Sequence, residues 1–73
     1  MPELDPVEYF EKMKKRIQRW KNMLAIAKAM IEAQEEAGIP TLAVWNRYQL
    51  IAARIEALEK AVDKALEELK KGE

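Results

Sequence analysis

The sequence of 73 residues contains no cysteine, no histidine and no serine. Without thiolate or imidazole groups, the chain cannot build a disulfide scaffold or the usual zinc and iron–sulfur sites. Mechanisms that combine a serine or cysteine nucleophile with histidine lack their parts. There are only two glycines and three prolines, and 36% charged residues are balanced by 49% hydrophobic ones, which is not a disordered composition. We therefore expect a folded protein that is not an enzyme, with no catalytic residues, no metal site and no cofactor.

Net charge and long apolar runs are also lacking. The 13 basic and 13 acidic residues cancel, so no overall field draws the chain toward nucleic acid or an anionic membrane. No stretch approaches the roughly 20 apolar residues of a membrane-spanning helix, and the N-terminus does not resemble a signal peptide. We expect a soluble protein without a targeting signal, cytoplasmic if expressed in a cell, that binds neither nucleic acid nor membrane.

Two long segments without glycine or proline are bounded by residues that start and stop helices. Asp5 is a favourable N-cap, and Pro6 suits the first helical position because its missing N–H has no partner to lose there. Gly38 is typical of the left-handed residue that follows a helix, and Pro40 prevents continuation. Thr41 is the expected N-cap of the second helix. The turn is short, so the two helices must run antiparallel.

Apolar residues recur at alternating spacings of three and four in both segments, which is the heptad pattern of packed helices. In the first segment they are Phe10, Met13, Ile17, Trp20, Leu24, Ala27 and Ile31. In the second they are Val44, Tyr48, Ile51, Ile55, Leu58, Val62, Ala65 and Leu69. The predicted fold class is all-α, an antiparallel two-helix hairpin over residues 1–73, with helices at about 6–37 and 42–71 and a turn at 38–41. Folding pairs residues whose numbers sum to about 79.

The charges support the same register. Six basic side chains and no acidic one lie in the first segment, at Lys12, Lys14, Lys15, Arg16, Arg19 and Lys21. The facing part of the second segment carries Glu56, Glu59, Asp63, Glu67 and Glu68. The basic strip lies next to Tyr9 and Trp20, as in nucleic-acid-binding surfaces. The facing acids and the zero net charge favour a charge match within the hairpin instead.

A second apolar row predicts a partner, because a lone hairpin has a thin core for the entropy that folding costs. In the first helix this row lies beside the heptad positions in the half nearest the turn, and Leu50 continues that side on the second helix, while Trp45 lies on the opposite flank. The expected association residues are Met23, Ile26, Met30, Ala33, Trp45, Arg47 and Leu50. We expect self-association to complete a four-helix bundle, with a homodimer favoured among the homo-oligomers.

Three other interpretations stay open at the level of sequence. The same surface could face a different protein or a helical peptide. Opposed small residues at Ala27, Ala52 and Ala53 could leave a cavity for a small molecule. Carboxylates at Glu32, Glu35 and Glu36 lie on one helix face, where a hard cation could bind, although a solvated helix end is the simpler explanation. Gln34 and Tyr48 fall at core positions near the turn, where a hydrogen bond could fix the register.

The whole chain resembles de novo designed helical hairpins and helical-bundle subunits. The resemblance rests on the D-P-V-E start, the G-I-P-T connection, the Ala, Glu, Lys and Leu filling, and the terminal A-L-E-E-L-K-K-G-E. It implies a designed structural protein that self-assembles into a homo-oligomeric bundle and has no catalytic activity. The alternative is a designed binding module whose apolar face near the turn engages another protein or a helical peptide. Trp20, Met30, Trp45, Asn46 and Arg47 are less generic than an idealised bundle needs.

Overall fold

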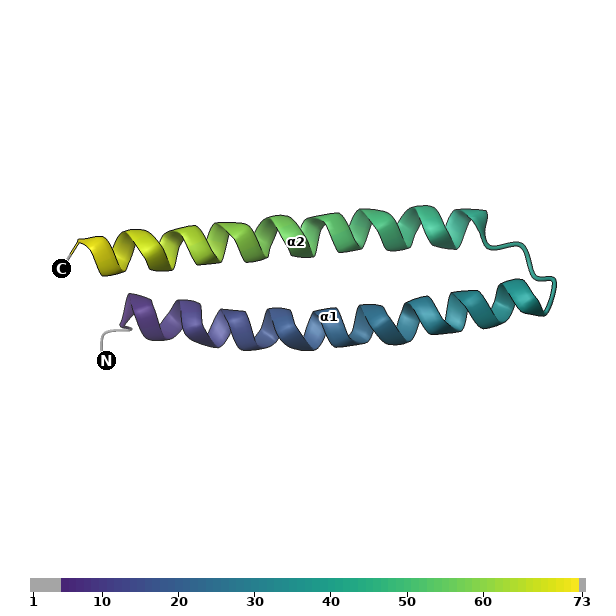
Figure 1. Cartoon of the computed structure of the whole chain (residues 1–73), viewed down its shortest axis with the longest axis horizontal. Coiled ribbons are helices and arrows are strands. Elements are labelled where there is room, and N and C mark those ends of the chain that lie inside the picture. Colours follow the sequence, from purple (N-terminus) through teal and green to yellow (C-terminus); the bar gives the residue numbers. More distant parts are fainter. Residues whose placement is uncertain (1–4, 73) are drawn as a thin grey trace.

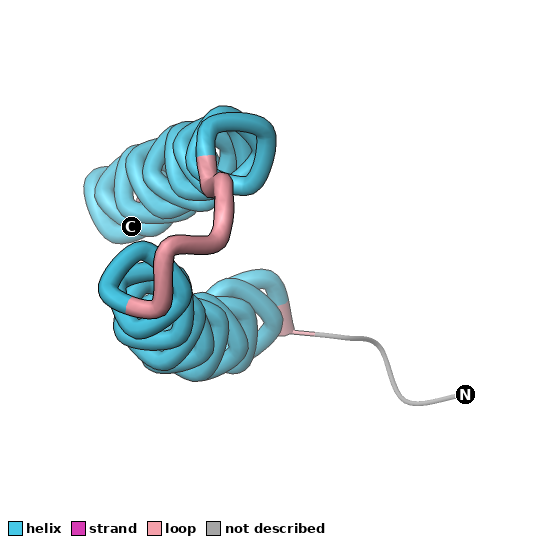
Figure 2. The backbone as a smooth tube through the Cα atoms, turned by 90° about the vertical axis from the view of Figure 1, so that its right-hand side faces the viewer, coloured by secondary structure: helices cyan, strands magenta, loops and turns pink. Residues whose placement is uncertain are grey.

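The structure, a computed structural model, describes residues 5–72 and contains two helices. Helix α1 spans Pro6–Glu36 and helix α2 spans Leu42–Lys71. They run antiparallel along a rod with principal extents of 55 × 21 × 16 Å (Figure 1). Viewed end-on, the helices are tilted relative to one another and α1 is curved (Figure 2). The predicted all-α antiparallel hairpin is confirmed; residues 1–4 and 73 of the predicted hairpin lie outside the described residues.

The ends of α1 form as the sequence predicts. The carboxylate of Asp5 accepts a hydrogen bond of 3.0 Å from the backbone N–H of Val7, so Asp5 is the N-cap. At the other end, Gly38 has a φ of 80°, a left-handed conformation that a side chain would strain. The N–H of Ile39 donates to the carbonyl of Gln34 at 3.0 Å, which satisfies a carbonyl at the end of the helix.

Thr41 stands at the start of α2 but does not cap it with its side chain. Its hydroxyl makes no capping hydrogen bond to the helix backbone and instead donates to the carboxylate of Glu35 at 2.8 Å. The expected side-chain cap is therefore wrong. The residue is buried because that hydrogen bond draws its side chain toward the end of α1.

The closed core lies in the half of the hairpin nearest the termini. Its buried residues are Ile17, Val62 and Leu66. Partly buried side chains pack around them, at Val7, Phe10, Met13, Ile55 and Leu58. Leu66 was not among the predicted heptad positions; it lies four residues after Val62 on the adjacent side of α2, so the contact here is wider than one row.

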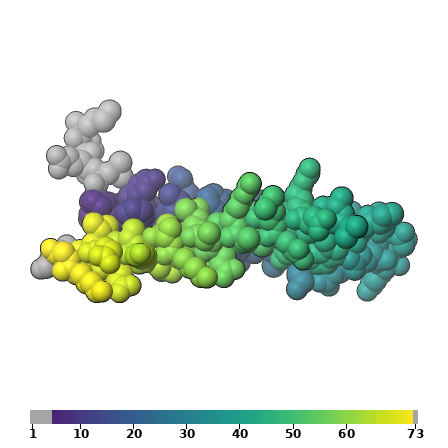
Figure 3. Space-filling model, turned by 90° about the horizontal axis from the view of Figure 1, so that it is seen from above, coloured from purple at the N-terminus to yellow at the C-terminus, as the bar shows by residue number. Residues whose placement is uncertain are grey.

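The half nearest the turn is more open. Ile31 is the one buried apolar residue there within residues 5–72, where three predicted core side chains stay substantially exposed, Trp20 at 37%, Val44 at 43% and Ile51 at 41%. The expectation that apolar groups on both sides close every layer is therefore wrong for this half. Both helices continue alongside one another here, as the space-filling view shows (Figure 3), but one side of their contact lacks a cover.

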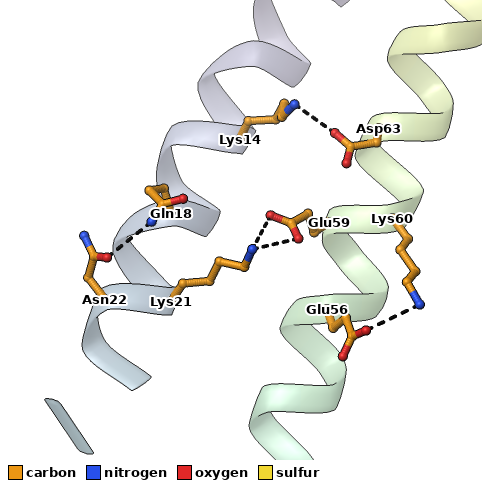
Figure 4. A network of polar contacts seen from close by, with 8 residues as sticks. All are labelled: Lys14, Gln18, Lys21, Asn22, Glu56, Glu59, Lys60 and Asp63. Carbon is orange, nitrogen blue, oxygen red and sulfur yellow. Dashed lines mark hydrogen bonds and ion pairs between the residues drawn. The ribbon is translucent and has the colours of Figure 1, made fainter. Parts of the chain in front are cut away.

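Ion pairs join the helices on the other side of the hairpin (Figure 4). The ammonium of Lys21 lies 2.7 Å from a carboxylate oxygen of Glu59, and that of Lys14 lies 2.9 Å from Asp63. The hydrogen bond to Asp63, together with its charge, raises the pKa of Lys14 above its ordinary value. These contacts match the predicted register, although each such exposed pair adds little stability.

Candidate association surface

One side of the helix–helix contact is an apolar groove. Its widest part has a volume of about 400 Å³ and is lined by Trp20, Met23, Leu24, Ala27, Ile51 and Ile55. A smaller hollow of about 180 Å³ continues toward the turn and is lined by Leu24, Ala27, Ile31, Val44, Arg47, Tyr48 and Ile51. Leu24, Ala27 and Ile51 line both parts, so we treat them as one surface, called here the apolar groove.

The groove follows from heptad spacing combined with a small residue at its centre. Trp20 and Ala27 are seven positions apart on one stripe of α1, with Leu24 beside them. Ile51 of α2 faces them, as expected when residue numbers sum to about 79. The methyl group of Ala27 does not reach far enough to cover Ile51, which therefore stays 41% exposed.

Most of the predicted association residues lie in or around this groove. Met23 lines it and is 64% exposed. Ile26 and Met30 follow at the helical spacing of three and four and are 64% and 61% exposed, and Leu50 of α2 is 55% exposed. Ala33 is also exposed, seven residues beyond Ile26 on the same stripe. The apolar surface of the groove thus extends outward over both helices.

Trp45 occupies a different place from the other predicted residues. It is half-buried, and its indole N–H donates a hydrogen bond to the carboxylate of Glu35 at the end of α1. Its ring contacts Tyr48 edge-on, with ring centroids 5.5 Å apart. Because Trp45 and Arg47 are two positions apart, they point to opposite sides of α2, and Arg47 is the one that lines the groove. Trp45 therefore belongs to the turn.

Glu35 connects these turn residues. One oxygen of its carboxylate accepts hydrogen bonds from both Trp45 and Thr41. The Trp45 hydrogen bond and, to a smaller extent, that of Thr41 lower the pKa of Glu35 below its ordinary value, against the opposing effect of desolvation. The carboxylate thus has a structural partner on α2, and no group of three or more acidic side chains in residues 5–72 is arranged to hold a metal ion.

The other sequence-level alternatives are separated by the structure. Ala27 lines the apolar groove, Ala52 lines a hollow on the side of Lys21 and Glu59, and Ala53 is exposed, so the three alanines do not share one cavity. Tyr48 contacts Trp45, and no hydrogen bond joins it to Gln34 within the described part of the chain.

Arginine placement is the feature that sequence reasoning did not use. The chain has four arginines: Arg16, Arg19, Arg47 and Arg54. Arg54 follows Arg47 by seven residues and shares its stripe of α2. In residues 5–72, each of the five ion pairs uses a lysine and none uses an arginine. The same heptad count that located the apolar rows could have found this segregation, because every arginine falls on a stripe flanking the groove.

The fold and groove define the class of protein: a helical hairpin with an apolar surface on one side. No protein-family model, curated protein or solved structure matches this chain. Over residues 5–72, neither helix combines the length and apolar character that crossing a membrane requires. The function must therefore be argued from the side chains of the hairpin itself.

Proposed function

We propose that this chain is a non-catalytic association module whose apolar groove packs against a helical surface of another chain. The observation that carries the proposal is the exposure of Met23, Ile26 and Met30, which stands above 60% on successive turns of one helix. Scattered exposed apolar residues are normal, but a continuous patch on a small protein marks an interaction surface. Covering the patch supplies the apolar burial that the open half of the hairpin lacks.

Self-assembly is the second candidate, because the exposed apolar residues lie on both helices. Met30 of α1 and Leu50 of α2 are 61% and 55% exposed, so a second hairpin could cover both helices at once. The product would be a four-helix bundle with two-fold symmetry. This is also the function that the resemblance to designed bundle subunits implies.

One pair of variants tests the shared proposal. Met30→Glu combined with Leu50→Glu places two carboxylates on the patch and should abolish association while the hairpin stays helical. The matched control is Gln18→Glu with Asn22→Glu, which adds the same charge at two exposed residues that hydrogen-bond to each other on another part of α1.

Sedimentation velocity and titration with helical peptides are the measurements, with circular dichroism as the check on folding. The wild type and the control should associate with a second copy or with a peptide, and the double variant should not. A wild-type hairpin that is fully helical, monomeric at high micromolar concentration and inert toward amphipathic peptides of either charge would contradict the proposal.

A further inference from the structure

We infer that the occupant of the apolar groove is an acidic amphipathic helix from a partner of different sequence. This inference rests on the proposed function and adds the chemistry of the partner. It comes from the arrangement of charge around the groove, where every flanking charged residue is basic.

The arginines frame the groove along α2 and at one end of α1. Arg47 lines the groove itself, and Arg54 lies seven residues further on the same stripe. In the register of the hairpin, these two residues stand level with the part of α1 between Leu24 and Ile31. On α1, Arg16 shares a stripe with Met23, and Arg19 shares one with Ile26, so both lie just beyond the Trp20 end.

Acidic residues are kept away from the groove. The stripes that flank it carry only apolar, glutamine and basic residues along its length: Met13, Arg16, Arg19, Trp20, Met23, Ile26, Ala27, Met30, Ala33 and Gln34 on α1, and Val44, Arg47, Leu50, Ile51, Arg54, Ala57 and Leu58 on α2. The two cross-helix ion pairs use Glu59 and Asp63, on the other side of the hairpin. The groove therefore offers four positive charges without an acidic neighbour on the same stripes.

The residue types point the same way. The chain uses lysine for its own ion pairs and places arginine beside the apolar surface. Guanidinium is planar, weakly hydrated and able to bind a carboxylate through two parallel hydrogen bonds, which suits an interface. Arginine is enriched at protein–protein interfaces and lysine is depleted. The aliphatic stem of Arg47 also covers apolar surface in the groove, as its contact with the hollow shows.

A second copy of the chain does not meet this chemistry. In a two-fold dimer the same patch lies on both sides of the interface, so Arg47 and Arg54 of one copy would face apolar residues or the arginines of the other. No carboxylate of the patch is available to pair with them. Like charges brought together at an interface oppose association, whereas a partner that supplies carboxylates removes this cost.

The shape of the groove selects a single helix. A groove between two antiparallel helices accepts a third helix, which completes a three-helix bundle by ridges-into-grooves packing. The distance along α1 from Trp20 to Ile31 is about 16 Å, or roughly three turns. The partner helix should therefore carry apolar residues at spacings of three and four, with two carboxylates seven residues apart on the edge that faces Arg47 and Arg54. Lys21 and Glu59 bridge the opposite side of the hairpin, so one helix binds per chain.

The test uses a pair of labelled peptides and the full chain. Each peptide is an amphipathic helix of about 18 residues with leucine at the apolar positions. One carries glutamate at the flanking positions and the other carries lysine. By fluorescence anisotropy, the acidic peptide should bind with one-to-one stoichiometry and weaken as salt is added, and the basic peptide should bind at least about tenfold more weakly.

Charge reversal on the hairpin provides the decisive comparison. Arg47→Glu with Arg54→Glu should weaken the acidic peptide by at least about tenfold and should strengthen the basic one. The matched control is Lys15→Glu with Lys28→Glu, which makes the same change in net charge on exposed residues of α1 away from the groove and should preserve the peptide preference. Circular dichroism verifies that each variant is folded.

The outcomes separate this inference from the proposed function. Equal binding of the two peptides, or a preference that survives the Arg47 and Arg54 reversal, would overturn the acidic-helix assignment. So would a hairpin that forms a dimer through Met30 and Leu50 and excludes the acidic peptide, although association itself would then be established. Absence of both dimer and peptide binding would overturn the proposed function as well.

Discussion

The indole N–H of Trp45 donates a hydrogen bond to the carboxylate of Glu35, ten residues earlier in the chain. The contact joins the last turn of α1 to the first turn of α2, and the hydroxyl of Thr41 reinforces it on the same oxygen. A carboxylate near the C-terminus of a helix is otherwise disfavoured by the helix dipole. Its two donors compensate for that position and couple the ends of the two helices.

The Glu35 contact predicts a pH dependence. The folded hairpin lowers the pKa of Glu35 below its ordinary value of 4.5, because Trp45 and Thr41 donate to the ionised form. Since the folded pKa is the lower one, the stabilisation is fully present above the ordinary pKa and is lost as pH falls through the folded value. The excess stability of the wild type over Glu35→Gln should therefore shrink as pH drops below about 4.5.

Thermal unfolding followed by circular dichroism at a series of pH values measures this difference. The emission of Trp45, recorded in a Trp20→Phe background, should shift over the same pH range as the indole loses its charged partner. A constant difference between wild type and Glu35→Gln down to pH 2 would show that the contact does not stabilise the turn.

The two glycines offer a matched pair of substitutions. Gly38→Ala should destabilise the hairpin by about 1 kcal/mol, because alanine resists a left-handed backbone. The cause is conformational alone: at Gly38, with its φ of 80°, an added methyl group would meet nothing within 4 Å. At Gly72, where φ is −72°, the same change should alter stability by less than about 0.5 kcal/mol.

Urea unfolding of both variants separates strain from a general effect of alanine. Gly38→Asn should recover part of the loss, since asparagine tolerates the left-handed region better than alanine does. Equal effects at Gly38 and Gly72 would argue against a requirement for a left-handed residue in the turn.

The core and the groove should respond differently to truncation. Ile17 is 1% exposed, so Ile17→Ala should cost about 2–4 kcal/mol, enough to unfold much of a small hairpin. Met23 is 64% exposed, so Met23→Ala should change the stability of the isolated hairpin by less than about 0.5 kcal/mol. The same Met23 variant should weaken association, because it removes apolar contact area from the groove.

Chemical denaturation at low protein concentration measures the two stabilities without a contribution from association. A Met23→Ala variant as unstable as Ile17→Ala would mean that Met23 is covered within the free hairpin, and would remove it from the proposed surface.

The Lys21–Glu59 contact should contribute only a small coupling. Its ammonium lies 2.8 and 2.7 Å from the two carboxylate oxygens, but both side chains remain partly exposed, at 42% and 30%. A double-mutant cycle with Lys21→Ala and Glu59→Ala should give a coupling of about 0.3–1 kcal/mol. The coupling should fall in 1 M salt, where charges on the surface are strongly screened. An undiminished coupling in salt would indicate packing by the lysine stem as its origin.

Sequence patterns predicted the elements of this protein better than their burial. Asp5 and Gly38 marked both ends of α1, and the alternating spacing of three and four predicted which stripe of each helix meets the other. Core positions at Trp20, Val44 and Ile51 followed the same pattern yet remain substantially exposed. Periodicity reports the direction of a side chain, and whether that direction is covered depends on the size of the residue opposite.

The prediction of the association residues was mixed for the same reason. The apolar row containing Met23, Ile26 and Met30 could be read from helical spacing alone, and these side chains are exposed. Trp45 could not be separated from them by composition, because its hydrogen bond with Glu35 depends on how the turn brings the helix ends together. The arginines were first grouped with a basic strip; in the structure, the cross-helix ion pairs come from Lys14 and Lys21.

The sequence by itself determined an all-α hairpin, the ends of its helices, its register and its apolar rows, because these depend on local backbone preferences and on spacing along a regular helix. Only the tertiary structure decided that one half closes around Ile17, Val62 and Leu66 while the other half leaves a groove. It also decided that Glu35 binds Trp45 and that arginines frame the open side. Such features arise when side chains from separate helices meet, so their sizes and charges must be considered in pairs.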